Sequence, residues 1–265
     1  MTGIERLDFD HVVEVGTDYS GRRLGSLSAH GSRFERCRFD QIRCDQVVFG
    51  AGMELTEYVD CSFDGVRFPS ILAGYSRFVR CTFRDAFLGD FGDDYLELVD
   101  CLFTGKLRST IFWGAPPRPT AEKRYQSLLR MLERSGRPVP PGFEELSRRP
   151  TNEFRGNDFS GAELLDITFR NIDLTLQRLP RGDEYLYLPH AEAAIDGALA
   201  AIGDRPGGPA AEDFLRRILG HEVSRGQRQL LLRQADFDNR GKAAGVVLAF
   251  DVLRVVDSSP DASVQ

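Results

Sequence analysis

Cysteines are the first residues of this chain to suggest chemistry, because thiolates form disulfides, bind zinc and act as nucleophiles. Cys37, Cys61, Cys81 and Cys101 lie in the motifs "RCRF", "DCSF", "RCTF" and "DCLF", with gaps of 24, 20 and 20 residues. There is no CxxC pair and no histidine at ligand spacing, and Cys44 makes the number odd. We therefore expect neither a disulfide framework nor a zinc site, and interpret the four spaced thiols as small apolar core residues.

Histidines and catalytic motifs give no stronger signal. His11, His30, His190 and His221 are scattered, without HExxH or other ligand spacing. We find no glycine-rich phosphate loop, no GxSxG elbow and no kinase signature. The sequence predicts a protein that is not an enzyme, with no catalytic residue, no metal and no cofactor.

Acidic residues form one concentrated run. No Lys or Arg occurs between Asp85 and Gly105. Since this span equals one circuit of the repeat described below, we expect its acids to surround one level of the molecule. They are a candidate partner-binding patch that would steer association with a basic protein surface, the alternative being a solvated surface that favours solubility. The six acids are Asp85, Asp90, Asp93, Asp94, Glu97 and Asp100.

The elements that carry these residues are indicated by an unusual period. In "NEFRGNDFSGAELLDITFRNIDL" a large apolar residue returns at every fifth position, where a helix would have it at three and four and a strand at two. The same period runs from Phe9 to Phe49 and, after one nine-residue step, from Tyr58 to Phe103, with Asp93 breaking one position. Something other than a helix or a flat strand is therefore specified.

The cysteine spacing of twenty is four of these five-residue units. We interpret each unit as one side of a square coil, so that four units close a circuit and circuits stack at about 4.8 Å, the spacing of hydrogen-bonded strands. No coil of such a solenoid buries its apolar face alone. The predicted core ladder consists of Cys37, Phe39, Cys61, Phe63, Cys81, Phe83, Cys101, Phe103, Phe154, Phe159, Leu164, Phe169 and Leu174.

In these motifs the chain resembles the pentapeptide-repeat family, whose loose consensus is a small residue, Asn or Asp, Leu or Phe, and two polar positions. "NDFSGAELLDITFRNIDL" fits it well, and "CSFDGVRF" and "CTFRDAFL" fit with cysteine in the small inward position. The resemblance covers residues 7–110 and 151–178, while the N-terminal 30 residues depart from it. It implies a mainly β fold, a right-handed quadrilateral β-helix, to which a helical insertion and a C-terminal α-helical region are added.

The domain organisation follows from where the period stops. We predict N-terminal coils over 1–110, an insertion over 111–150, further coils over 151–180, an α-helical region over 181–258 and a disordered tail over 259–265. In the insertion, a helix is expected from Pro119 and Thr120 to Gly136. Its eight Lys and Arg against four Asp and Glu allow a phosphate-binding patch, but its apolar stripe favours a helix that docks on or caps the open coil. The stripe is Ala121, Tyr125, Leu128, Leu129 and Leu132.

Four helical segments are expected in the C-terminal region. "LPHAEAAIDGALAAIGD" and "PAAEDFLRRILG" have helical patterns, and "SRGQRQLLLRQ" opens with Ser224 and Gln227 at capping-box spacing. The last, "NRGKAAGVVLAFDVLRVV", is apolar nearly all round, and its period does not separate a buried helix, a subunit interface and a late strand.

Composition limits the cellular setting. The 265 residues are 42% hydrophobic with a net charge of -6, so direct nucleic-acid binding is not expected. No apolar run approaches the roughly 18 residues of a membrane span, and the start "MTGIERLDFDHV" lacks the features of a signal peptide. We predict a cytoplasmic protein without a membrane partner.

Three functions remain open at this level. The first is a non-enzymatic scaffold that binds a protein partner. The second is implied by the resemblance, because some pentapeptide-repeat proteins look like duplex DNA and bind and protect type II topoisomerases such as DNA gyrase. The acidic run and a homodimer through the apolar C-terminal segment would suit it, but residues 31–110 carry 13 acids and 10 bases, and six or so coils span only about 29 Å. The third is an enzyme or ligand site within 184–256.

Overall fold

The computed structural model describes residues 5–237 and 244–257. The chain divides into two compact units: Met1–Thr168 with Ile172–Pro180, and Phe169–Asn171 with Arg181–Gln265. The predicted tail 259–265 lies outside the described residues.

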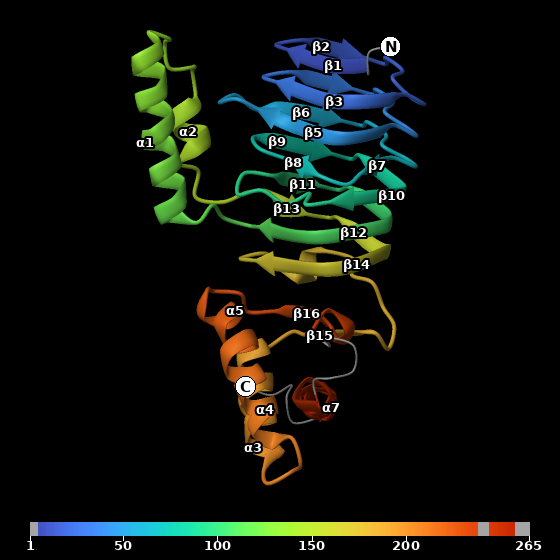
Figure 1. Cartoon of the computed structure of the whole chain (residues 1–265), viewed down its shortest axis with the longest axis vertical. Helices are drawn as coiled ribbons and strands as arrows, with labels where there is room; N and C mark the ends of the chain where they lie inside the picture. Colours follow the sequence, from blue (N-terminus) through green and yellow to red (C-terminus); the bar gives the residue numbers. More distant parts are fainter. Residues whose placement is uncertain (1–4, 238–243, 258–265) are drawn as a thin grey trace. The chain divides into compact units, whose positions relative to one another are not determined.

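The first unit is a parallel β-solenoid (Figure 1). Its longer sheet has the path β1-β3-β5-β7-β10-β12-β14, with β8 (Ile71–Leu72) beside β5, and its shorter sheet has the order β13-β11-β9-β6-β4-β2. The long-sheet strands are β1 Glu5–Asp10, β3 Arg23–His30, β5 Arg43–Ala51, β7 Arg67–Phe68, β10 Thr82–Gly89, β12 Leu102–Trp113 and β14 Asp158–Arg170. The short-sheet strands are β2 Val13–Val15, β4 Arg33–Glu35, β6 Thr56–Val59, β9 Ser76–Val79, β11 Glu97–Val99 and β13 Phe154–Arg155.

Neighbouring strands pair residues one coil apart. Tyr58 pairs with Phe78 and Thr82 with Leu102, each twenty residues along the chain, whereas Phe34 pairs with Tyr58 across the longer gap of 24. The N-terminal 30 residues, which depart from the consensus, nevertheless form β1, β2 and β3. Backbone pairing therefore extends the solenoid beyond the part in which the consensus is recognisable.

One corner of the coil falls at a recurring sequence position, here called the corner column, that the five-residue apolar period does not mark. Arg36, Asp60, Arg80 and Asp100, each directly before a cysteine, have φ between 52° and 54°. This left-handed conformation is uncommon for residues other than glycine. Its recurrence at one position per coil shows that the chain turns the same corner on each circuit.

Aromatic rings form the centre of the solenoid. Tyr19, Phe39 and Phe63 stack with ring centroids 5.1 and 4.9 Å apart, and the column continues through Phe83, Phe103 and Phe159 at 4.9, 4.8 and 4.8 Å. Planes within this column are tilted by 16° or less. A second column stacks Phe34, Tyr58 and Phe78. The separations match the expected coil spacing, and every residue of the predicted core ladder is buried.

The cysteine thiols are part of the same core. The Sγ atoms of Cys61, Cys81 and Cys101 donate to the backbone carbonyls of Phe34, Tyr58 and Phe78, at 3.5, 3.3 and 3.5 Å. Burial raises the pKa of Cys37, Cys44 and Cys81, while a hydrogen bond with Cys81 lowers that of Cys61. All five cysteines are free and buried, so they act in packing.

The insertion docks on the solenoid wall. Helix α1 (Arg118–Ser135) is capped at its C-terminus by Gly136, the residue at which the sequence predicted its end. A φ of 63° lets the Gly136 backbone N–H donate to the Glu133 carbonyl. Figure 1 shows α1 and α2 (Phe143–Ser147) beside the stacked strands. The apolar cluster between helices and wall consists of Met53, Tyr75, Tyr95, Ala121, Tyr125, Leu132 and Phe143, with Leu128, Leu129 and Leu146 against it.

The second unit combines helices with a two-stranded antiparallel sheet. Its helices are α3 Ala191–Ile202, α4 Gly208–Asp213, a π-helical stretch Phe214–Leu219, α5 Gly220–Ser224, α6 Gln234–Phe237 and α7 Ala244–Asp257. Its antiparallel strands are β15 Tyr185–Leu188 and β16 Leu230–Arg233. A separate core includes Leu188, Ile195, Leu215, Phe250 and Leu253. The apolar last segment is a helix over its described residues, with Phe250 and Leu253 fully buried.

One predicted helix of this unit is wrong. The capping-box spacing of Ser224 and Gln227 does not start a helix: Ser224 ends α5, and Leu230–Arg233 is a strand. The Gln227 side chain is buried and donates to the Gln229 carbonyl at 2.6 Å. Pairing of β16 with β15 decides the conformation, because it satisfies the backbone groups that a helix would otherwise bond internally.

Among the described residues, no helix combines the length and apolarity needed to cross a membrane. The cytoplasmic location stays a prediction.

The stacked column makes a stability prediction. Phe83→Ala should lower the free energy of unfolding by about 3 to 5 kcal/mol, because it opens a cavity between two stacked rings. Phe87, on the same strand but half-buried with Arg67 over its ring at 4.7 Å, is the matched control. Phe87→Ala should cost about 1 kcal/mol. Denaturant unfolding monitored by circular dichroism measures both, and equal losses would contradict the assignment.

Candidate functional site

The acidic patch is not the continuous exposed ring that the sequence suggested. Glu97 is buried, with 7% of its surface exposed, and pairs with Arg77 at 3.2 Å and Arg149 at 3.3 Å. Its Oε1 also accepts from the Glu153 amide at 2.9 Å. The prediction that Glu97 belongs to an exposed patch is therefore wrong. Arg149, at the C-terminal end of the insertion, covers the Glu97 carboxylate and neutralises its charge.

Three of the other acids lie together. Asp90, Asp93 and Asp94 line one shallow hollow, which Gly92, Ser109, Ile111, Trp113 and Arg124 complete. Arg124 pairs with Asp93 at 3.6 Å and lies over the rings of Tyr75 and Tyr95, 5.2 Å from each centroid. Burial and the charge of Asp93 raise the pKa of Asp94. We call this surface the acidic hollow.

The remaining two acids lie elsewhere. Asp85 lines a different hollow with Asp64 and Arg84, and Asp100 pairs with Arg155 at 3.6 Å. One patch in the sequence is therefore three separate environments in the structure: a buried ion pair, the acidic hollow and two corner acids, each near an arginine.

Several charges outside the hollow are paired between coils. Arg80 binds Asp60 through two bonds of 2.7 and 2.8 Å, and Arg84 pairs with Asp64 at 3.0 Å. Each pair joins residues twenty positions apart. The corner column alternates in sign through Arg36, Asp60, Arg80 and Asp100. Such alternation weakens any extended negative face.

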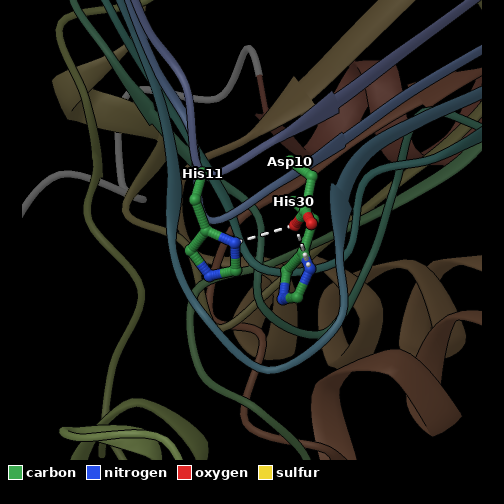
Figure 2. A group of neighbouring side chains, drawn as sticks. All are labelled: Asp10, His11 and His30. Atoms are coloured by element: carbon green, nitrogen blue, oxygen red, sulfur yellow. Dashed lines mark hydrogen bonds and ion pairs between the residues drawn. The ribbon is translucent and has the colours of Figure 1, made fainter.

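A second polar cluster was not predicted. Two imidazoles and two carboxylates meet near the N-terminal end of the long sheet: Asp10 ends β1, His11 follows it, His30 ends β3, and Glu54 lies between β5 and β6. Asp10 Oδ1 is 2.7 Å from His11 Nδ1 and 3.2 Å from His30 Nδ1, as Figure 2 shows. Glu54 Oε2 lies on the opposite side, 2.6 Å from His11 Nε2 and 3.6 Å from His30 Nε2.

The electrostatics of this cluster favour positive charge. Hydrogen bonds that the imidazole donates to the Glu54 and Asp10 carboxylates raise the pKa of His11. The His11 and His30 ring centroids are 4.7 Å apart. One ligand atom from each of Asp10, His11 and His30 lies within 4.8 Å of the other two, which is compatible with a shared cation.

The length of one coil is the sequence feature that could have revealed this cluster. The pairing of β1 with β3 places Asp10 opposite His30, twenty positions away, which brings His11 beside the same ring. A linear motif such as HExxH describes ligands that lie one helix turn apart in the sequence. A solenoid instead brings together residues that lie one circuit apart. Glu54 is harder to find, because it lies in the coil with the 24-residue gap.

No model of a known protein family matches the chain, and no curated protein is significantly similar to it in sequence.

The buried pairing of Glu97 generates a prediction about the insertion. Arg149→Met should lower the free energy of unfolding by about 3 kcal/mol, because it leaves Glu97 buried with one partner fewer. The neighbouring Arg148 is the matched control, since its pairs with Glu122 and Glu144 are exposed. Arg148→Met should cost about 1 kcal/mol or less.

Chemical denaturation of both variants measures this difference. Adding Glu97→Gln to Arg149→Met should restore part of the loss, because the amide carries no charge to desolvate. A loss in Arg149→Met no larger than in Arg148→Met would contradict a stabilising role for the pair.

Proposed function

We propose that the chain is a pentapeptide-repeat protein whose solenoid is a right-handed quadrilateral β-helix. Support comes from the five-residue apolar period, the twenty-residue register between strands and the column of cysteine and phenylalanine side chains inside the coils. The family's properties do not extend to the docked insertion or to the second unit.

We further propose that the protein is a non-enzymatic interaction scaffold that binds a protein partner at the acidic hollow. The observation that carries this proposal is the convergence of Asp90, Asp93 and Asp94 beside Ile111 and Trp113. A partner that presents a Lys or Arg side chain next to an apolar residue fits this chemistry. The carboxylates would bind the cation, while Ile111, which is 38% exposed, would offer apolar contact.

The frame around the hollow supports such a role. Arg124 is held between Asp93 and the Tyr75 and Tyr95 rings, and the hydroxyls of both tyrosines bond to Ser147, each at 2.9 Å. These contacts fix the wall and the docked helix together. A surface that is rigid before binding loses less conformational entropy when a partner docks.

The alternative, a DNA mimic that binds a type II topoisomerase such as DNA gyrase, has less support. Duplex DNA carries one negative charge per about 1.7 Å, in an unbroken series. In this solenoid Arg80, Arg84 and Arg155 pair with acids on adjacent coils. The homodimer expected through the C-terminal region stays a prediction; Val247 and Val255 are exposed on α7.

The test is quantitative binding with matched charge variants. A partner recovered by cross-linking in lysate is purified and titrated against the wild type and Asp90→Asn/Asp94→Asn. We expect the affinity to fall about tenfold, with the larger loss at low salt, because exposed charges act through long-range attraction. Asp8→Asn/Asp45→Asn, which removes the same charge from exposed positions elsewhere on the solenoid, should bind as the wild type does.

Two outcomes would contradict the proposal. Equal losses of affinity in both double variants would show that binding depends on net charge and not on the hollow. Inhibition of gyrase supercoiling by the wild type that disappears in Asp90→Asn/Asp94→Asn would instead support the DNA mimic.

A further inference from the structure

The cluster at the N-terminal end of the solenoid has the donors of a metal centre. Neutral imidazole nitrogen together with carboxylate oxygen is a ligand set for zinc and its neighbours in the first transition row, whereas magnesium and calcium favour oxygen alone. Asp10, His11 and His30 supply two nitrogens and one carboxylate from two adjacent coils. We propose that these three residues bind one divalent cation of the zinc type, with Glu54 as the outer carboxylate that orients the His11 ring.

The distances suit this assignment. Donors that share a tetrahedral zinc ion at about 2.1 Å lie roughly 3.4 Å apart. Asp10 Oδ1 is 2.7 Å from His11 Nδ1 and 3.2 Å from His30 Nδ1. A small rotation of side chains opens this triangle around a cation, and Figure 2 shows both Nδ1 atoms turned toward the Asp10 carboxylate.

Glu54 supplies the second feature of a metal-binding histidine pair. A ligating imidazole usually donates its other ring N–H to a carboxylate, which fixes the tautomer and the direction of the ring. Glu54 Oε2 is hydrogen-bonded to His11 Nε2 at 2.6 Å, on the side away from Asp10, whereas His30 Nε2 at 3.6 Å is an ion-pair neighbour only.

Two glycines leave space for the rings. A Cβ atom at Gly31 would lie 3.0 Å from His11 Cδ2, and one at Gly52 would lie 2.3 Å from His30 Nε2. Both glycines also have positive φ, of 49° and 80°. A larger residue at Gly31 or Gly52 would displace the neighbouring ring, so glycine at these two corners leaves the imidazoles of His11 and His30 in place.

The cation would act on the end of the solenoid. β1 is the first strand of the long sheet and is mostly exposed. Bonds from Asp10 and His11 to the ion that His30 also holds would fasten this coil to the next. Binding to the folded state alone raises its stability as the metal concentration rises. This inference does not depend on the acidic hollow or on the proposed scaffold function.

The experiment uses the metal-free, full-length chain without a polyhistidine tag, titrated with Zn²⁺ by calorimetry. One Zn²⁺ per chain is expected, and about a thousandfold excess of Mg²⁺ should not displace it. Glu54→Gln should weaken binding about 10-fold to 100-fold, and His11→Gln or His30→Gln should weaken it further. His190→Gln and His221→Gln, exposed histidines of the second unit, should bind as the wild type does.

Two further readouts separate this site from other sources of binding. Hydrogen exchange at the amides of β1 and β3 should slow with Zn²⁺ in the wild type and stay unchanged in His30→Gln. Co²⁺ in place of Zn²⁺ should give no sulfur-to-metal absorption band, because the five cysteines are buried in the core. Absence of saturable binding, undiminished binding in both His11→Gln and His30→Gln, or a sulfur band would overturn the assignment.

Discussion

The structure of the first unit depends on one constraint: the backbone pairs each wall residue with the residue one coil further on, in most coils twenty positions away. A side chain that points inward therefore meets its counterpart from the next coil. Phe63, Phe83 and Phe103 stack for this reason, at centroid separations of 4.9 and 4.8 Å. Because one coil has no core of its own, its apolar residues are buried by its neighbours, and stability belongs to the stack.

The same register controls the charges on the outside. Like charges at one position in successive coils would lie about 4.8 Å apart and repel each other. The corner column instead alternates between arginine and aspartate, and the two bonds from Arg80 to Asp60 are one result. Alternation of this kind makes the corner column nearly neutral over two coils. It does not extend to every column, because Arg23, Arg43 and Arg67 pair in register on three successive coils.

The sequence was sufficient to predict the solenoid, because the inward residues obey the same local rule in most coils. It was not sufficient for Glu97, which the five-residue period places outside and which is buried because Arg149, 52 positions later, covers it. The capping-box spacing at Ser224 failed because pairing with β15 decided the fold of Leu230–Arg233. The histidine cluster matches no linear motif, because its members come together only across coils, one or two circuits apart in the chain.

Both candidate sites lie where the repeat is broken. Glu54 reaches the histidines from the coil with the 24-residue gap, and Asp93 occupies the position at which the five-residue period fails. A regular solenoid wall offers the same features on every coil, so a partner would bind it in several equivalent registers. An interruption makes one level different from the others and permits a single mode of binding. The irregular coils are therefore the parts of the frame that can carry specificity, and the regular coils hold them rigid.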